Sequence, residues 1–330
     1  MNVFLVTSPF QYICACEAKA HYKTKENILI LVNQESEPGI TQQNKLVNFS
    51  EWDCVITIGR TSRSKQVPSV IRKIRKMAHG RVIDHFFHAE YNAWRTKLIL
   101  RNLDIVKEVY FDDGTLTINE YEDYIRGKNV YYRPRFFQDL LVRLQGCKVI
   151  DSLEQSKNLE IFTIFKINKP EHKIVKNELL ALKEKFKNHT IYNENSPIGF
   201  IGQGAIGHKR KKSEDQYTSE IIELIKKFNR EIIYFPHRTE SSNLRNKIKK
   251  IPGIIYHQSS LPLELEIIDK NISLSGFIGI FSTAQYTYKL LDKNLPVYNT
   301  ISETTYSLMT ERSKRIHTAF KAIGIQDLTL

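Results

Sequence analysis

Residues 27–33 read Asn-Ile-Leu-Ile-Leu-Val-Asn, a run that is apolar on both of its alternating faces. Strands in the centre of a parallel sheet have this pattern, because both of their faces are buried. Similar runs occur at 54–58 and 106–111, and stretches of helical spacing such as 10–20 lie between the runs. Strands that alternate with helices predict a doubly wound α/β domain.

A second alternating series begins near residue 198. It contains predicted strands at 198–201, 231–235, 253–256, 276–281 and 296–298, with helices at 218–228 and 284–291. We therefore predict an α/β protein with two Rossmann-like domains that face a central cleft. The N-terminal domain is placed at 1–155, an inter-domain region at 156–195 and the C-terminal domain at 196–330.

Composition narrows the classes of partner. The chain has 330 residues, of which 41% are hydrophobic, and a net charge of +13. Such a charge favours nucleic acid, an anionic membrane surface, or phosphorylated and carboxylated small molecules. No window approaches 18 consecutive apolar residues, and the N-terminus lacks the basic segment of a signal peptide. We therefore expect a cytoplasmic protein.

Polar residues follow several of the predicted strands. Asp112 and Asp113 precede Gly114 after one strand, His237 follows Pro236 after another, and Ser282 with Thr283 follows a third. Open α/β sheets bind their ligands beyond the carboxyl ends of the strands. These residues are therefore candidates for a site of group transfer.

The sequence Gly202-Gln203-Gly204-Ala205-Ile206-Gly207 has the letters of a dinucleotide-binding motif. It is followed by a basic loop, 208–212, rather than by a helix, and no acidic residue ends the next strand. The motif therefore fails the test of its structural context. Phosphate-loop, zinc-protease and serine-hydrolase motifs do not occur in the sequence.

Five short segments, in this order, resemble glycosyltransferase family 52, which includes bacterial lipooligosaccharide sialyltransferases. They are Leu5–Ala18, Asp112–Gly114, Gly202-Gln203, Pro236–Arg238 and Ser282–Ala284. The resemblance spans most of the chain, and its weight comes from the order of the segments.

The resemblance implies the GT-B fold and transfer, with inversion, from CMP-sialic acid to a bacterial surface glycan, lipooligosaccharide or capsule. It implies no obligatory metal or other cofactor. The partners would be the CMP-activated sugar and a glycan acceptor, with no specific nucleic acid. The N-terminal domain would bind the acceptor, and the C-terminal domain would bind CMP.

The resemblance also suggests roles for single residues. His237 would meet the donor phosphate, as a protonated imidazole, and Ser282 and Thr283 would bind phosphate at a helix start. Asp215 would be the catalytic base, with Asp113 as the second candidate. Gly202, Gln203 and Arg238 would line the substrate site; Arg238 stands where proline is common in the family.

Plain structural roles are open for the same residues. Asp215 follows Ser213 in a helix-capping pattern, Asp113 precedes a turn glycine, and Ser282 fits a helix N-cap. The aromatic and basic run 131–137 suits either a core edge or an acceptor-sugar platform. Glucose or another nonulosonic acid as the transferred sugar, a basic nucleic-acid-binding protein, peripheral contact with the inner membrane, and a homodimer also stay open.

Overall fold

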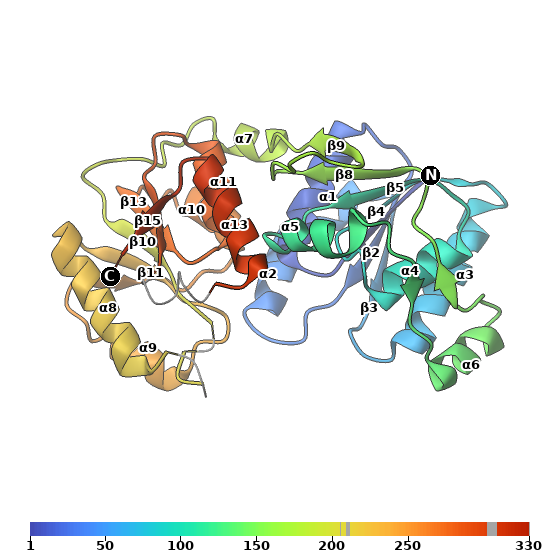
Figure 1. The fold of residues 1–330 in the computed structure, drawn as a ribbon, viewed down its shortest axis with the longest axis horizontal. Coiled ribbons are helices and arrows are strands. Elements are labelled where there is room, and N and C mark those ends of the chain that lie inside the picture. Colours follow the sequence, from blue (N-terminus) through green and yellow to red (C-terminus); the bar gives the residue numbers. More distant parts are fainter. Residues whose placement is uncertain (205, 209–211, 302–308, 330) are drawn as a thin grey trace. The chain divides into compact units, whose positions relative to one another are not determined.

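The computed structural model describes residues 1–330 except 205, 209–211, 302–308 and 330. The chain divides into two compact units, Met1–Leu182 (unit 1) and Lys183–Leu330 (unit 2). Each unit contains its own parallel sheet with helices (Figure 1). The predicted class, α/β with two Rossmann-like domains, is confirmed.

Unit 1 has a seven-stranded sheet in the order β3-β2-β1-β4-β5-β8-β9, in which every pair is parallel. Its strands are β1 (Asn2–Val6), β2 (Asn27–Val32), β3 (Cys54–Ile58), β4 (Ile83–His88), β5 (Ile105–Phe111), β8 (Leu159–Thr163) and β9 (Lys173–Lys176). A small antiparallel pair is formed by β6 (Tyr131–Tyr132) and β7 (Ser152–Leu153).

The helices of unit 1 cover both faces of its sheet. Strands β2, β3, β4 and β5 are followed by α2 (Gly39–Leu46), α3 (Arg63–Ala78), α4 (Trp94–Asn102) and α5 (Leu116–Glu120). Helix α6 (Phe136–Leu144) comes later, and α7 (Leu180–Phe186) begins in unit 1 and ends in unit 2. Helices α3 and α4 pack on one face through Ile71 and Leu98, and α1 (Pro9–His21) packs on the other through Ala15. This two-sided cover buries β1 and β2 on both faces, as the apolar run at 27–33 predicts.

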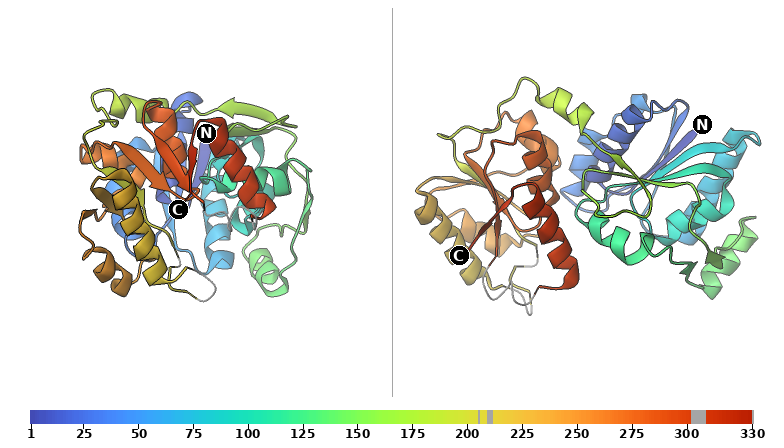
Figure 2. Two further views of the ribbon diagram at one scale, coloured as in Figure 1. Left: turned by 60° about the vertical axis from the view of Figure 1, so that its left-hand side comes forward. Right: turned by 45° about the horizontal axis from the view of Figure 1, so that its top comes forward.

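Unit 2 consists of a parallel sheet with helices packed around it (Figure 2). The sheet has six strands in the order β12-β11-β10-β13-β14-β15. The strands are β10 (Ile198–Ile201), β11 (Ile232–Phe235), β12 (Ile254–Tyr256), β13 (Gly276–Gly279), β14 (Val297–Thr300) and β15 (Gln326–Leu328). The helices are α8 (Glu214–Phe228), α9 (Ser242–Ile248), α10 (Leu263–Asp269), α11 (Thr283–Leu291) and α13 (Glu311–Ala322).

The prediction that residues 156–195 form an inter-domain region is wrong. Strands β8 and β9 lie inside it and extend the sheet of unit 1, so the first unit ends at Leu182 rather than at 155. Strand β8 is buried along its whole length, even at Glu160, whose carboxylate accepts hydrogen bonds from Lys107 and Lys173. These two lysines allow a charged residue to stand in a buried strand.

Candidate functional site

In unit 2, three predicted site segments leave the same edge of the sheet. Gly202 follows β10, His237 comes shortly after β11, and Ser282 comes shortly after β13. Strand β10 pairs in parallel with both β11 and β13. The carboxyl ends of the three strands therefore adjoin, as the sequence predicts for a ligand-binding edge.

The glycine turn after β10 packs directly against the histidine loop after β11. A Cβ atom on Gly202 would lie 2.8 Å from the backbone nitrogen of His237 and 2.7 Å from the Tyr234 hydroxyl. A Cβ atom on Gly204 would lie 2.8 Å from Cε1 of the His237 ring. A side chain at Gly202 would push the two backbone segments apart, and one at Gly204 would displace the His237 ring, so both glycines favour the observed position of His237.

The hydrogen bonds of His237 determine which of its ring nitrogens carries the proton. The backbone N–H of Thr239 donates to Nδ1 at 3.2 Å, and the Thr239 hydroxyl lies 2.8 Å from the same nitrogen. Because Nδ1 accepts, the neutral ring carries its proton on Nε2. Burial, and then the charge of Arg238, lower the pKa of His237 below its ordinary value. At neutral pH the imidazole is therefore an uncharged N–H donor, not the cation expected from the sequence.

A network of hydrogen bonds from tyrosine hydroxyls stabilises this edge of the sheet. The Tyr234 and Tyr256 hydroxyls both donate to the carboxylate of Glu240, at 2.6 Å each. The Tyr217 hydroxyl accepts from the backbone N–H of Gln203 at 3.1 Å and lies 3.4 Å from the Tyr234 hydroxyl. The sequence analysis missed this support, although two of its tyrosines lie in the strands β11 and β12.

The start of α11 is held by the amide of Gln285, which is fully buried. The N–H of Ser282 donates to Oε1 of Gln285 at 2.9 Å, and Nε2 of Gln285 donates to the Tyr298 carbonyl at 2.7 Å. Ser282 is the N-cap and Thr283 the first residue of the helix, both half-buried. The positive end of the helix dipole at this edge favours an anion.

Asp215 has the surroundings of a capping residue. It lies in the first turn of α8, after the N-cap Ser213, with 87% of its side chain exposed. Its carboxylate pairs with Lys247 at 2.7 Å. Arg238, next to His237, is also exposed. The basic residues 209–211 singled out from the sequence lie outside the described residues.

In unit 1, Asp112 and Asp113 have different surroundings. Asp112 is buried and accepts hydrogen bonds from the Thr163 hydroxyl (2.5 Å) and the Ile164 N–H (2.8 Å), so it ties the end of β8 to that of β5. Burial raises the pKa of Asp112 to about 7. Asp113 is half-buried and accepts a hydrogen bond from Nε2 of Gln11 at 2.8 Å. Burial raises the pKa of Asp113 to about 6.

Further polar groups lie at the same edge of unit 1 and were not foreseen. Glu90, shortly after β4, accepts a hydrogen bond from the Thr7 hydroxyl at 2.7 Å and pairs with Arg95 at 3.3 Å. The charge of Glu90 also contributes to the raised pKa of Asp113. Arg60, after β3, donates to the Thr7 carbonyl at 2.7 Å. Strands β1, β4 and β5 are neighbours, which explains why these groups meet.

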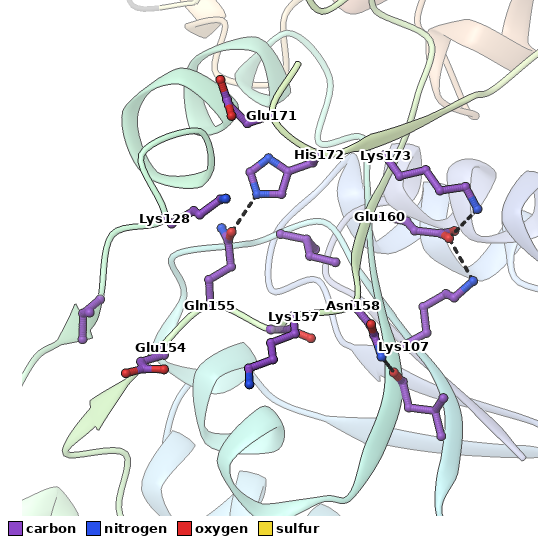
Figure 3. A pocket seen from close by; sticks show the side chains of 14 residues that line it. Lys107, Lys128, Glu154, Gln155, Lys157, Asn158, Glu160, Glu171, His172 and Lys173 are labelled. Carbon is purple, nitrogen blue, oxygen red and sulfur yellow. Dashed lines mark hydrogen bonds and ion pairs between the residues drawn. The ribbon is translucent and has the colours of Figure 1, made fainter. Parts of the chain in front are cut away.

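A cavity of about 960 Å³ lies at the opposite edge of this sheet, at the amino ends of β5, β8 and β9 (Figure 3). Three of its charged side chains are paired with one another, Glu160 with Lys107 and Lys173, and His172 forms a hydrogen bond with Gln155. None of the site residues predicted from the sequence lines it. Among the described residues, no cluster of three or more His, Cys, Asp or Glu side chains could hold a metal ion.

No family model and no curated protein matches the chain. Several solved structures do match the chain. The chain is similar to UDP-GlcNAc 2-epimerase from Methanocaldococcus jannaschii (15% identity, 100% of this chain and 89% of that one, TM-score 0.52). It is similar to UDP-GlcNAc 2-epimerase from Neisseria meningitidis bound to UDP-GlcNAc (14%, 97% and 91%, 0.55). It is also similar to an α/β-galactoside α-2,3-sialyltransferase from Photobacterium phosphoreum (11%, 99% and 97%, 0.50).

At these identities the likeness concerns the fold. It extends over both units of the chain, so the chain shares the two-domain α/β fold of GT-B type with these structures. Epimerases and a glycosyltransferase are both among the matches, and the fold alone does not distinguish their reactions. Membership of glycosyltransferase family 52 stays a prediction from the sequence.

Proposed function

We propose that the protein is an inverting glycosyltransferase that moves sialic acid from CMP-sialic acid to a hydroxyl of a bacterial surface glycan. The observation that carries the proposal is the Nε2–H of His237, which has no partner among the described residues. It lies beside the glycine turn, at the same edge of the sheet as the start of α11. A neutral N–H donor and a positive helix end together suit the phosphate of a departing nucleotide monophosphate.

In this reaction the acceptor oxygen forms a bond to the anomeric carbon, and the bond from that carbon to the phosphate oxygen breaks. The electron pair leaves with CMP, where His237, Ser282 and Thr283 stabilise the charge. The proton of the acceptor hydroxyl goes to a base. We assign the base to Asp113, because Asp215 is exposed and already paired with Lys247. With a pKa of about 6, Asp113 is ionised at neutral pH and still basic enough to accept a proton.

Calorimetric titration of the protein with CMP and with UDP tests the donor assignment. We expect CMP to bind more tightly. In His237→Phe the ring still packs on Gly204 but lacks the N–H. A hydrogen bond to a charged group contributes about 1.5–3 kcal/mol, so the affinity for CMP should fall by about 10- to 100-fold. His189→Phe, in the same unit, is the control. Equal affinity of the wild type and His237→Phe for CMP would contradict the assignment.

Hydrolysis and transfer assays distinguish the alternative functions. Turnover of CMP-sialic acid that persists in EDTA supports a metal-independent sialyltransferase. Turnover of UDP-glucose or of another CMP-nonulosonic acid in its place would support the alternative donors. A nucleic-acid-binding protein would instead show a sequence or structure preference beyond the salt-dependent attraction that a net charge of +13 produces by itself.

We further propose peripheral contact with an anionic membrane through α6. The exposed fractions of Phe136, Phe137 and Leu144 are 79%, 75% and 75%. Exposed Arg133 and Arg143 flank these apolar groups. Aromatic and aliphatic groups beside arginines suit the interface of anionic lipids. No helix among the described residues is long and apolar enough to span a membrane.

Flotation with vesicles of phosphatidylglycerol, compared with phosphatidylcholine, tests this contact. The double variant Phe136→Ser, Phe137→Ser should lose binding to the anionic vesicles, whereas Phe49→Ser, which removes an exposed phenylalanine elsewhere, should keep it. If the double variant floats like the wild type, α6 does not bind the membrane. A double variant that instead converts a dimer to a monomer in light scattering would assign the face to a second copy of the chain.

A further inference from the structure

Unit 1 contains a second, smaller cavity of about 220 Å³. Its lining comes from the loop after β4, the start of α4, the π-helical turn Tyr121–Ile125 and the strand β6. Four tyrosines and two cations form much of the lining: Tyr91, Lys97, Tyr124, Tyr131, Tyr132 and Arg133. Tyr91 directly follows Glu90, so the cavity adjoins the edge of the sheet that carries Asp113.

The cation of Lys97 is unusual because it is buried without an ion pair. The residue is 4% exposed, and its Nζ lies 3.4 Å from the centroid of the Tyr91 ring. Among the described residues it has no hydrogen bond and no carboxylate within ion-pair distance. The two nearby acids have other partners: Glu108 pairs with His88, and Glu120 accepts from the Tyr110 hydroxyl and the Tyr91 N–H. Buried cations in proteins are normally paired with an anion.

The protonation of Lys97 fits an anion-binding group. Burial lowers the pKa of its ammonium to about 8, while Glu108 and Glu120 act in the opposite direction. The side chain therefore carries its charge at neutral pH. An anion in the cavity would supply the partner that the protein does not.

Two further residues of the lining are Tyr131 and Arg133. Tyr131 is buried, with 8% of the residue exposed, and its hydroxyl is itself covered by the protein. The guanidinium of Arg133 lies near it and is exposed. An ammonium and a guanidinium thus line the same space as several aromatic rings. Rings of this kind pack against the C–H faces of sugars, while the polar groups bind hydroxyl and acidic substituents.

We propose that this cavity binds one sugar residue that carries a carboxylate or a phosphate, with the anionic group on Lys97 and the sugar ring on the tyrosines. The volume of about 220 Å³ lies below the range of about 300–1,000 Å³ that accommodates drug-sized ligands, so it suits a single residue and not an oligosaccharide. In the proposed glycosyltransferase this sugar would be part of the acceptor, and that assignment rests on the proposed function. The binding of an acidic sugar does not rest on it.

Calorimetry or saturation-transfer NMR on the full chain tests the proposal with three probes that differ only at C6 of the sugar. These are methyl galactoside, the methyl glycoside of galacturonic acid and methyl galactoside 6-phosphate. We expect at least one acidic probe to bind at least tenfold more tightly than methyl galactoside, and comparison of the two acids identifies the preferred anion. Equal binding of all three, or binding of none, would overturn the proposal.

Lys97→Met removes the charge and keeps the volume of the side chain. Because it also removes a desolvated cation, the variant should melt no lower than the wild type. It should lose the preference for acidic probes, and Arg133→Met, which removes the second cation of the lining, should weaken their binding several-fold. The exposed substitution Lys73→Met should change nothing. An unchanged preference in Lys97→Met would overturn the proposal. The affinity for CMP, measured on the same samples, reports separately on the proposed function.

Discussion

Gln11 controls the acidity of Asp113, and its removal gives a prediction with a defined sign. Nε2 of Gln11 donates to the Asp113 carboxylate at 2.8 Å, while Oε1 of Gln11 accepts the Thr7 N–H, also at 2.8 Å. Burial raises the pKa of Asp113, and the bond from Gln11 opposes this rise because it favours the ionised form. In Gln11→Met the bond is lost, and the pKa of Asp113 should therefore rise further.

The size of the effect follows from the geometry. A hydrogen bond to a charged group contributes about 1.5–3 kcal/mol, and 1.36 kcal/mol corresponds to one pH unit. The full effect would be about one to two pH units. Because Asp113 is half-buried, water will replace part of the lost bond, and we expect its titration midpoint to rise by about one unit. If Asp113 is the base, turnover falls as the pH drops through its pKa, so the acidic limb of the rate profile should move upward by the same amount.

Carbon-13 NMR titration of labelled aspartates measures the pKa directly, with Asp113→Asn identifying the signal. The pH profile of turnover is the second readout. Gln43→Met is the matched control, since Gln43 also accepts a backbone N–H, that of Gln34 at 2.7 Å, but does not contact Asp113. A wild-type midpoint at the ordinary aspartate value would refute the argument from burial. A raised midpoint that does not change in Gln11→Met would refute the role of Gln11.

Three other substitutions have defined outcomes. Gly202→Ala should destabilise the protein by about 1–3 kcal/mol in urea unfolding and weaken CMP binding. The control Gly276→Ala, whose Cβ would meet nothing nearer than 3.4 Å, should change the stability little. Equal effects of the two substitutions would refute the close-packing argument. Asp215→Asn should keep turnover within about threefold of the wild type, and a hundredfold loss would return the base to Asp215. Glu240→Leu leaves two tyrosine hydroxyls without an acceptor and should lower the free energy of unfolding by about 2–5 kcal/mol. The substitution Glu223→Leu, at an exposed position, should leave it nearly unchanged.

Much of the sheet architecture could be predicted from the sequence because most central strands are uniformly apolar. The run at 27–33 became β2 (Asn27–Val32), and 54–58 became β3 (Cys54–Ile58). The region 156–195 was misassigned because the signal there is weak. Strand β8 contains a charged residue whose partners come from other strands, and β9 begins and ends with lysine. Only the assembled sheet shows why these residues can belong to strands.

The site was predictable in position and less so in chemistry. The sequence places His237 after a strand and Ser282 before a helix, and the structure agrees. The protonation of His237 depends on a backbone N–H two residues away, and the acidity of Asp113 depends on Gln11, which is 102 residues away. Such dependence on the local environment, and on residues distant in the chain, cannot be obtained from the spacing of motifs.

The position of each unit's first strand in its sheet has a consequence for synthesis. Strand β1 has neighbours on both sides, and so has β10, so each sheet can grow outward from the strand that the ribosome delivers first. The strands left at the outer edges of the first sheet are β3 and β9, and β9 carries lysine at each end. Lysines at an edge discourage pairing with a second, unfinished chain. The order of strands thus limits the time for which an unpaired strand edge is exposed to other chains during synthesis.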